Sequence, residues 1–270
     1  MSKVVFWSPK STRTGATHSL IALSAITAID NKFSSVILQG HWQSKVIESA
    51  FTPYFELKAM DVFTNSNIGM SALTRLIDSN KLNSEAIRNY AKPVLRNRLD
   101  ILYGLNVKER EAYRKMFENM SYVIGKADEA YDMVFFDSPK GQDSHAVTSL
   151  LKNADLIVVT VSQNIIDIDE FFSRYEEIQI LKEKKHIIVI GDYDESSKFT
   201  AFNLKNKYKM KVPIFTIPSC TQFRDAVNDG NTMNFLYNNI NASPRDAIGN
   251  FINETRKIER AMLDQLGIKE

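Results

Sequence analysis

The loop after the first apolar run, Val4–Trp7, carries the residue types that a phosphate group needs. A segment of helical period begins after Gly15, and the first turn of such a helix presents free amides and a partial positive charge to an anion. Lys10 and Arg13 add formal charge, and the hydroxyl of Thr17 stands where it can bind Mg²⁺. The segment therefore predicts a phosphate site at a strand-to-helix turn.

A simpler interpretation of this loop remains open. The full Gly-x-x-x-x-Gly-Lys-Thr spacing of a phosphate-binding loop is absent, so a Ser/Thr-rich turn that caps a helix without a ligand also explains the segment. If the site exists, its nucleotide-binding candidates are Lys10, Ser11, Thr12, Arg13, Thr14, Gly15, Ala16, Thr17 and His18.

A second strand end favours the phosphate interpretation. The apolar run Met133–Phe136 ends in a carboxylate, Asp137, and a tight turn with Gly141 follows. A carboxylate in this place holds the Mg²⁺ shell of phosphoryl-transfer proteins, although a turn-capping role for Asp137 is the alternative. Ligands of doubly wound sheets bind beyond the carboxyl ends of the strands, so the two elements together predict one site.

Apolar runs of strand length alternate along the chain with amphipathic segments of helical period. The predicted strands are Val4–Trp7, Ser35–Leu38, Leu99–Tyr103, Met133–Phe136, Leu156–Val161, Ile187–Ile190 and Val212–Ile217. The predicted helices are Ala16–Asp30, Val107–Lys126, Ser144–Lys152, Ile166–Lys182 and Ser197–Tyr208. This alternation predicts an α/β fold with a doubly wound, mainly parallel sheet and helices on both faces.

Two regions depart from the alternation. Residues 51–97 show helical patterns at Met70–Ser79 and Ser84–Tyr90 but no clear strand, which predicts an irregular helical insertion over one end of the sheet. Residues 244–267 predict a C-terminal helix, with Ser243 as N-cap and Pro244 in the first helical position. At 270 residues the chain can bury one substantial core, and we expect a single domain over residues 1–270.

Composition argues against several classes of protein. A formal net charge of +2 gives no overall reason for nucleic-acid binding, and the single cysteine, Cys220, excludes an internal disulfide framework. The four scattered histidines show no metal-ligand spacing. The apolar runs are too short to cross a membrane and the N-terminus is unlike a signal peptide, so we expect a cytoplasmic protein.

The order of these motifs resembles that of the ParA/MinD family of P-loop ATPases. The family's second motif, Asp-Ser/Thr-Pro-x-Gly after a strand, is similar to YDMVFFDSPKG. Its next strand and helix, its base-contacting turn and its late Ile-Pro segment resemble NADLIVVTVSQNIIDIDEF, IIVIGDYDESSKF and VPIFTIPSCTQFRDAVNDG. The resemblance spans nearly the whole chain and is closest to divergent members from mobile elements or from secretion and pilus loci.

The resemblance implies roles for individual residues. Thr17 and Asp137 match the positions that hold Mg²⁺, Asp192 lies near the base-contacting position, and Pro218 begins the segment that borders the adenine. The glycines that match the two phosphate-facing loops are Gly15 and Gly141. The implied cofactors are ATP and Mg²⁺.

Departures from the family pattern predict weak catalysis. Ala16 occupies the place of the phosphate-binding lysine, and Ser11 that of the signature lysine of the deviant Walker A motif. Lys10 substitutes only if the loop shifts, and Lys10 and Asp137 are the catalytic candidates. After the second strand, Leu38-Gln39-Gly40-His41 lacks the carboxylate that helps position the attacking water in the family. Losing such charges removes on the order of several kcal/mol, so we expect slow or absent ATP hydrolysis.

The implied function is the positioning of plasmid or other mobile-element DNA, or of a conjugation, secretion or pilus apparatus. A homodimer that responds to nucleotide and binds a protein partner performs this function in such proteins. The alternative is a non-enzymatic scaffold that kept the fold and lost the nucleotide. The direction of Lys10, into the loop or into solvent, separates the two hypotheses.

Two further surfaces allow more than one interpretation. A basic stretch around the predicted Ser197–Tyr208 helix suggests non-specific DNA binding, while a solvated helix face is the simpler explanation. Its candidates are Lys205, Lys207, Lys209 and Lys211. The C-terminal helix has an apolar stripe and a polar face of mixed charge, which disfavours membrane attachment. We expect it to dock on the protein's own sheet or on a dimer partner.

Overall fold

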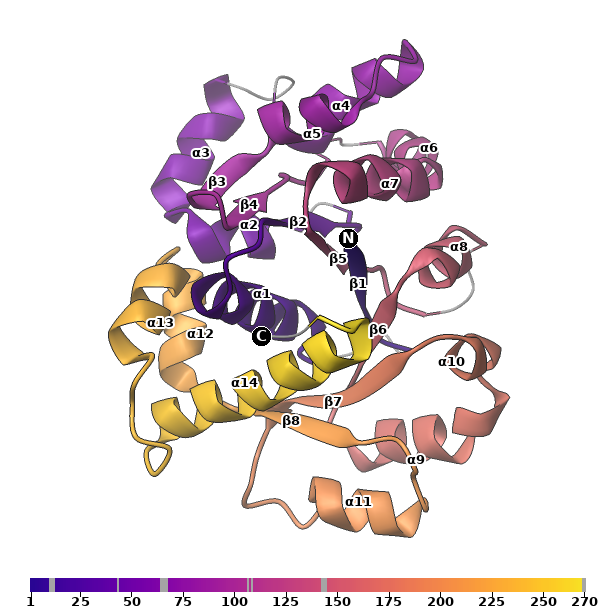
Figure 1. Cartoon of the computed structure of the whole chain (residues 1–270), viewed down its shortest axis with the longest axis vertical. Coiled ribbons are helices and arrows are strands. Elements are labelled where there is room, and N and C mark those ends of the chain that lie inside the picture. The colour runs from indigo at the N-terminus through magenta and orange to yellow at the C-terminus, as the bar shows by residue number, and fades with distance from the viewer. Residues whose placement is uncertain are drawn as a thin grey trace.

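The computed structural model describes residues 1–9, 13–42, 44–63, 68–105, 107, 109–141 and 145–268. Within these residues one sheet of eight strands runs in the order β3-β4-β2-β5-β1-β6-β7-β8 (Figure 1). Its strands are β1 (Ser2–Trp7), β2 (Ser35–Gln39), β3 (Lys92–Leu95), β4 (Leu99–Ile101), β5 (Met133–Asp137), β6 (Leu156–Val161), β7 (His186–Tyr193) and β8 (Ile214–Pro218). Neighbours are parallel except β3 and β4, which confirms the predicted α/β class.

Helices cover both faces of the sheet. Those of the first half are α1 (Ala16–Asp30), α2 (Val46–Phe51), α3 (Tyr54–Phe63), α4 (Gly69–Asp78), α5 (Ser84–Tyr90), α6 (Arg110–Glu118) and α7 (Met120–Ala130). Those of the second half are α8 (His145–Asn153), α9 (Ile165–Ser173), η1 (Tyr175–Glu177), α10 (Gln179–Glu183), α11 (Ala201–Lys207), α12 (Thr221–Asn228), α13 (Thr232–Asn239) and α14 (Ala247–Leu266).

Strand alternation divides the core into two apolar layers. In β1, Val4 and Phe6 pack on the side of α1 and α14, whereas Val5 and Trp7 pack on the side of α7 and α8. Successive side chains of a strand point to opposite faces, so continuous apolar strands require helices on both sides. The central strand β1 lies between β5 and β6, and this change of direction in strand order places a crevice at its carboxyl end.

The C-terminal helix α14 packs on the protein's own sheet, one of the two positions predicted for it. It contacts β8 and α1, and Phe251, Ile258 and Met262 on its inner stripe are buried. In Figure 1 it crosses the same face of the sheet as α1. Among the described residues, no helix is both long and apolar enough to cross a membrane.

The insertion contains a strand that the sequence did not predict. β3 is a short edge strand of four residues that pairs antiparallel with β4 and is only partly buried. Its sequence, Lys-Pro-Val-Leu, lacks the apolar alternation of a buried strand. Pro93 removes a ladder donor, which an edge strand tolerates.

Four predicted helices have different bounds, and one of them, predicted over 197–208, begins only at Ala201 as α11. The helix predicted over 107–126 is divided at Asn119, whose side chain donates to the Lys115 carbonyl, because asparagine competes for backbone hydrogen bonds. The helix predicted over 166–182 is α9, η1 and α10. The C-terminal helix begins at Ala247 after Asp246, so the predicted caps at 243 and 244 were wrong. Ser243 instead crosses the first turn of α14, where a Cβ on Gly249 would lie 1.9 Å from its carbonyl oxygen.

Candidate nucleotide and metal site

Thr17 and Asp137 meet at the carboxyl end of the central strands. Gly15, in a left-handed conformation at φ 72°, begins α1 and places Thr17 in the first turn. Asp137 is the last residue of β5, which pairs with β1. The Thr17 hydroxyl donates to Asp137 Oδ2 at 2.7 Å, and Asp137 is fully buried. The two residues that the sequence singled out as metal ligands, 120 positions apart, are therefore in direct contact.

His41 is a third member of this cluster, and the sequence did not assign it a role. It follows β2, whose Gln39 lies in register with Asp137 on β5. Its Nε2 atom lies 3.3 Å from Asp137 Oδ2, and the imidazole is 20% exposed. The available signal was its place directly after a buried strand, but only the strand order shows that β2 and β5 are neighbours.

The second carboxylate oxygen of Asp137 is unsatisfied. Oδ1 is buried and finds no hydrogen-bond partner among the residues that the structure describes. An unpaired buried carboxylate oxygen costs free energy, and such groups in native proteins call for an explanation such as an ion or a ligand. The geometry fits a cation at this cluster.

Backbone contacts hold the loop after β5 against the loop after β1. The Trp7 indole Nε1 donates to the Gly141 carbonyl at 3.0 Å, and the Gly141 amide donates to the Ser8 carbonyl at 3.0 Å. Gly141 has a φ of 81°, a conformation that favours glycine. The two loops that the sequence linked to phosphate therefore form one edge of the site.

A glycine on β7 lets the first loop pack closely on the sheet. A Cβ on Gly191 would lie 2.4 Å from the Thr14 carbonyl oxygen and 3.1 Å from the Cα of Gly15. Thr14 is itself buried, with its hydroxyl 3.3 Å from that of Thr160 on β6. The conformation of the loop therefore depends on a close approach that a side chain at Gly191 would prevent.

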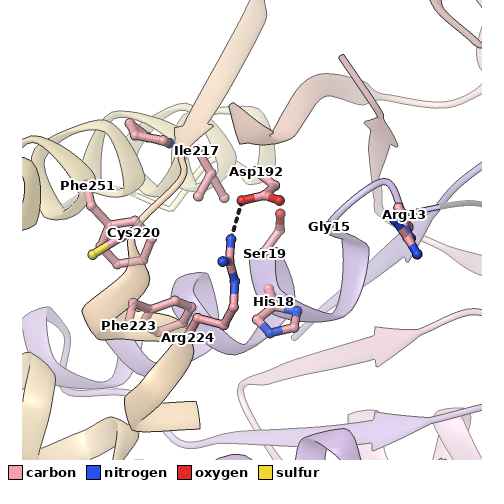
Figure 2. A pocket seen from close by; sticks show the side chains of 11 residues that line it. Arg13, Gly15, His18, Ser19, Asp192, Ile217, Cys220, Phe223, Arg224 and Phe251 are labelled. Atoms are coloured by element: carbon pink, nitrogen blue, oxygen red, sulfur yellow. Dashed lines mark hydrogen bonds and ion pairs between the residues drawn. The ribbon is translucent and has the colours of Figure 1, made fainter. Parts of the chain in front are cut away.

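A pocket of about 240 Å³ adjoins the start of α1. Its lining includes Arg13, Gly15, His18, Asp192, Pro218 and Arg224, with Phe223 and Phe251 at its apolar side. Figure 2 shows Arg224 reaching from α12 toward Asp192 on β7, beside His18 and Ser19 of α1. An apolar pocket with convergent polar groups beside a helix N-terminus can take the base and sugar of a nucleotide.

Arg224 supplies positive charge to this pocket and acts on two of its residues, Asp192 and His18. Its Nη2 atom donates to Asp192 Oδ1 at 2.8 Å, and Asp192 adopts a φ of 50°, which is strained for a residue other than glycine. Burial lowers the pKa of His18, and the positive Arg224 lowers it further. Burial also raises the pKa of the Cys220 thiol, which disfavours the thiolate.

Several predicted site residues do not add charge to the cluster. Ala16 is buried and carries no cation where a phosphate-binding lysine was sought. Arg13 is exposed at the end of the first loop. The positions Lys10, Ser11 and Thr12 lie outside the described residues. The direction of Lys10, which separates the two hypotheses, therefore stays untested. The described residues therefore fit a cation and a nucleoside.

The basic stretch lies away from this site. α11 contacts β8, which β6 and β7 separate from β1. Lys207 pairs with Asp169 at 3.3 Å and donates to the Tyr208 hydroxyl at 2.9 Å. The other members, Lys205, Lys209 and Lys211, are exposed.

A parallel sheet whose central strand leads through a glycine-ended loop into a helix, with threonine and aspartate in contact beneath it, has the architecture of P-loop nucleotide-binding proteins. Comparison with solved structures identifies the fold as that of the ParA and MinD ATPases. A ParA family ATPase from Chlorobium tepidum TLS matches with a TM-score of 0.70 and 11% identity over 96% of this chain and 98% of its own.

Two nucleotide complexes match over a similar extent. MinD from Pyrococcus horikoshii OT3, complexed with Mg-ADP, has a TM-score of 0.67 and 13% identity over 98% of this chain and 99% of its own. A putative plasmid partition protein from Borrelia burgdorferi B31, bound to AMPPNP, has a TM-score of 0.64 and 14% identity over 98% and 99%. No protein-family model matches the sequence, and a search of curated proteins finds no match.

Proposed function

We propose that this chain binds ATP with a divalent cation, hydrolyses it slowly or not at all, and uses the bound state to position a cargo through a protein partner. The observation that carries this proposal is the buried Asp137, which contacts Thr17 at the start of α1 and leaves Oδ1 without a partner. A buried acid in this state is suited to a cation that arrives with a phosphate group.

Different residues of this chain bind the phosphates, the cation and the base. The first amides of α1 face the phosphates, and Thr17 and Asp137 hold the cation, which when bound neutralises phosphate charge. The pocket beside Pro218 takes the base, with Asp192 and Arg224 at its polar side. Ala16 supplies no positive charge to the transferred phosphoryl group. The site therefore retains nucleotide binding while hydrolysis is slow or absent.

The output of the bound state is association. Among proteins of this fold, MinD of Aquifex aeolicus has been solved as a MinC:MinD complex, which supports a protein partner here. We propose a homodimer as the nucleotide-bound state, with the exposed lysines near α11 as a surface for non-specific DNA. The rival is a scaffold in which His41 stays in contact with Asp137 and no nucleotide binds.

Binding of a fluorescent non-hydrolysable ATP analogue with Mg²⁺ tests the proposal. We expect saturable binding to the parent chain, and a loss of about tenfold or more in Thr17→Val, since a hydrogen bond to a charged group contributes about 1.5–3 kcal/mol. Thr17→Ser keeps the hydroxyl and serves as the matched control. If the parent chain does not bind the analogue at millimolar concentration, the scaffold hypothesis replaces the proposal.

A further inference from the structure

We infer that the cation site of this chain has mixed oxygen and nitrogen ligands, with His41 bound to the metal beside Asp137 and Thr17, and that it favours Mn²⁺ over Mg²⁺. The role of the cation rests on the proposed function, whereas its binding is measurable without any nucleotide.

The side chains of Thr17 and His41 converge on one carboxylate oxygen of Asp137. The three residues lie far apart in the sequence. The Thr17 hydroxyl lies 2.7 Å from Asp137 Oδ2, and His41 Nε2 lies 3.3 Å from the same oxygen. Two ligands at right angles around an octahedral cation, each about 2.1 Å from it, lie about 3 Å apart. The two observed separations from Oδ2 lie on either side of that value, so each neighbour is placed to share a cation with Asp137.

The position of His41 is held by tightly packed backbone. The Gly40 amide donates to the Asp137 carbonyl at 2.8 Å, and the Tyr113 hydroxyl donates to the Gly40 carbonyl. A Cβ on Gly40 would lie 2.7 Å from Pro139 Cδ and 2.8 Å from Phe136 Cζ. The imidazole therefore follows an anchored residue and is presented to the carboxylate with little freedom, which is what a metal ligand needs.

Burial of the acid makes a cation favourable at this point. Asp137 has no exposed surface, and its Oδ1 atom lacks a partner within the described part of the chain. Charged groups removed from water are stable when they are paired or bound to a metal. Apart from Thr17, the His41 imidazole is the side chain that contacts the carboxylate among the described residues.

The nitrogen ligand determines which cation is favoured. Mg²⁺ prefers oxygen ligands at near-ideal octahedral geometry, whereas imidazole suits first-row transition metals, and Mn²⁺ accepts carboxylate oxygens as well. Within the described residues, no group of three or more His, Cys, Asp or Glu side chains is placed to hold a metal. The remaining positions are therefore left to water or to phosphate oxygens, as in an open site.

Mn²⁺ alone, added to the full chain without nucleotide, is the probe. Electron paramagnetic resonance of free Mn²⁺ gives the dissociation constant, competition with Mg²⁺ gives the preference, and electron spin-echo modulation reports a directly bound ¹⁴N. We expect ¹⁴N coupling in the parent and in His145→Asn, a control at an exposed histidine of α8. In His41→Asp, we expect the coupling to vanish and the preference for Mn²⁺ to fall about tenfold or more.

Two results would overturn the inference. The first is bound Mn²⁺ without ¹⁴N coupling in the parent, which would make His41 a counter-ion of Asp137. The second is no Mn²⁺ binding at millimolar concentration in a chain whose circular dichroism shows it folded. His41→Asn, which keeps a neutral side chain, repeats the test if His41→Asp fails to fold.

The outcomes separate this inference from the proposed function. Nucleotide binding by a parent chain that shows no ¹⁴N coupling refutes the ligand assignment alone. Mn²⁺ bound with ¹⁴N coupling, in a chain that binds no ATP analogue, refutes the nucleotide proposal and leaves the metal site in place.

Discussion

Acidic side chains at the two ends of the parallel strands differ in how fully they are hydrogen-bonded. At the amino ends, Asp132 accepts hydrogen bonds from the Ser34 amide at 2.8 Å and the Ser34 hydroxyl at 2.9 Å, and Asp30 accepts two from Arg256 at 2.7 and 2.8 Å. At the carboxyl ends, Asp137 and Glu48 are buried, and each has an oxygen without a partner among the described residues. The amino end has one such oxygen as well, Oδ1 of the partly exposed Asp128, whereas Asp137 and Glu48 at the carboxyl end are almost fully buried.

Left-handed backbone conformations occur at both ends of the strands. Arg13 and Asp192, both at the carboxyl end, have positive φ angles of 28° and 50°. At the amino end, Asn97 before β4 and Lys209 before β8 have positive φ angles of 60° and 52°. The buried acids with an unsatisfied oxygen, and not backbone strain, therefore distinguish the carboxyl end, where ligands bind in folds of this kind.

Trp7 provides the largest test, because it ties the carboxyl-end loops to the core. Its ring is fully buried, and we expect Trp7→Ala to lower the free energy of unfolding by about 3–5 kcal/mol. Trp7→Phe retains most of the ring but loses the bond to the Gly141 carbonyl, so we expect a smaller loss and weaker nucleotide binding. Urea denaturation of both variants measures the difference, and a Trp7→Phe variant as stable as the parent would show that the indole bond does not hold the loop.

Glu48 tests whether the carboxyl end is destabilised by its own charge. Burial raises the pKa of Glu48 above its ordinary value of 4.5, although the Gly104 amide and the Gln39 amide group donate to it. The folded state therefore holds the proton more tightly than the unfolded state. Stability from this group is full below pH 4.5 and is lost as pH rises through the folded pKa, by at most about 1.4 kcal/mol per pH unit.

Glu48→Gln removes this titration, and we expect a flatter stability profile above pH 4.5 than in the parent. Chemical denaturation at a series of pH values measures it. A profile that keeps the slope of the parent in the variant would assign the loss of stability to another group.

A pair of matched substitutions has the smallest effects, and we expect them to be opposite in sign. Asp137→Asn removes a buried charge with an unused oxygen, so we expect the chain to gain about 1 kcal/mol in stability while cation and nucleotide binding fall. Asp132→Asn weakens an exposed, satisfied acid, so we expect a loss below about 1 kcal/mol with binding unchanged. Thermal unfolding with a binding assay measures both, and losses of stability in both variants would contradict the contrast between the two ends.

The pH dependence of Asp132 has the sign opposite to that of Glu48. Hydrogen bonds from the Ser34 backbone lower the pKa of this carboxyl. Its contribution is therefore present above its ordinary pKa of 3.8 and is lost as pH falls, and the effect is small because the group is exposed.

Local sequence patterns determined the framework of this protein. The strands β2, β5 and β6 begin at the predicted residues, because continuous apolar runs between turn signals are local features. Thr17 and Asp137 were identifiable for a related reason, since each stands at the end of such an element. The edge strand β3 and the start of α14 were not identifiable from the sequence. An edge position and a chain crossing depend on neighbours that are distant in sequence.

The tertiary structure alone decided which residues complete the site. His41 reaches Asp137 because β2 and β5 are adjacent, Arg224 reaches Asp192 because α12 lies over the end of β7, and Gly191 matters because the first loop lies on it. None of these contacts follows from the spacing of residues in one segment. Strand order and helix packing join segments that no periodicity links, so the sequence by itself determined the class of site, and the fold determined its ligands.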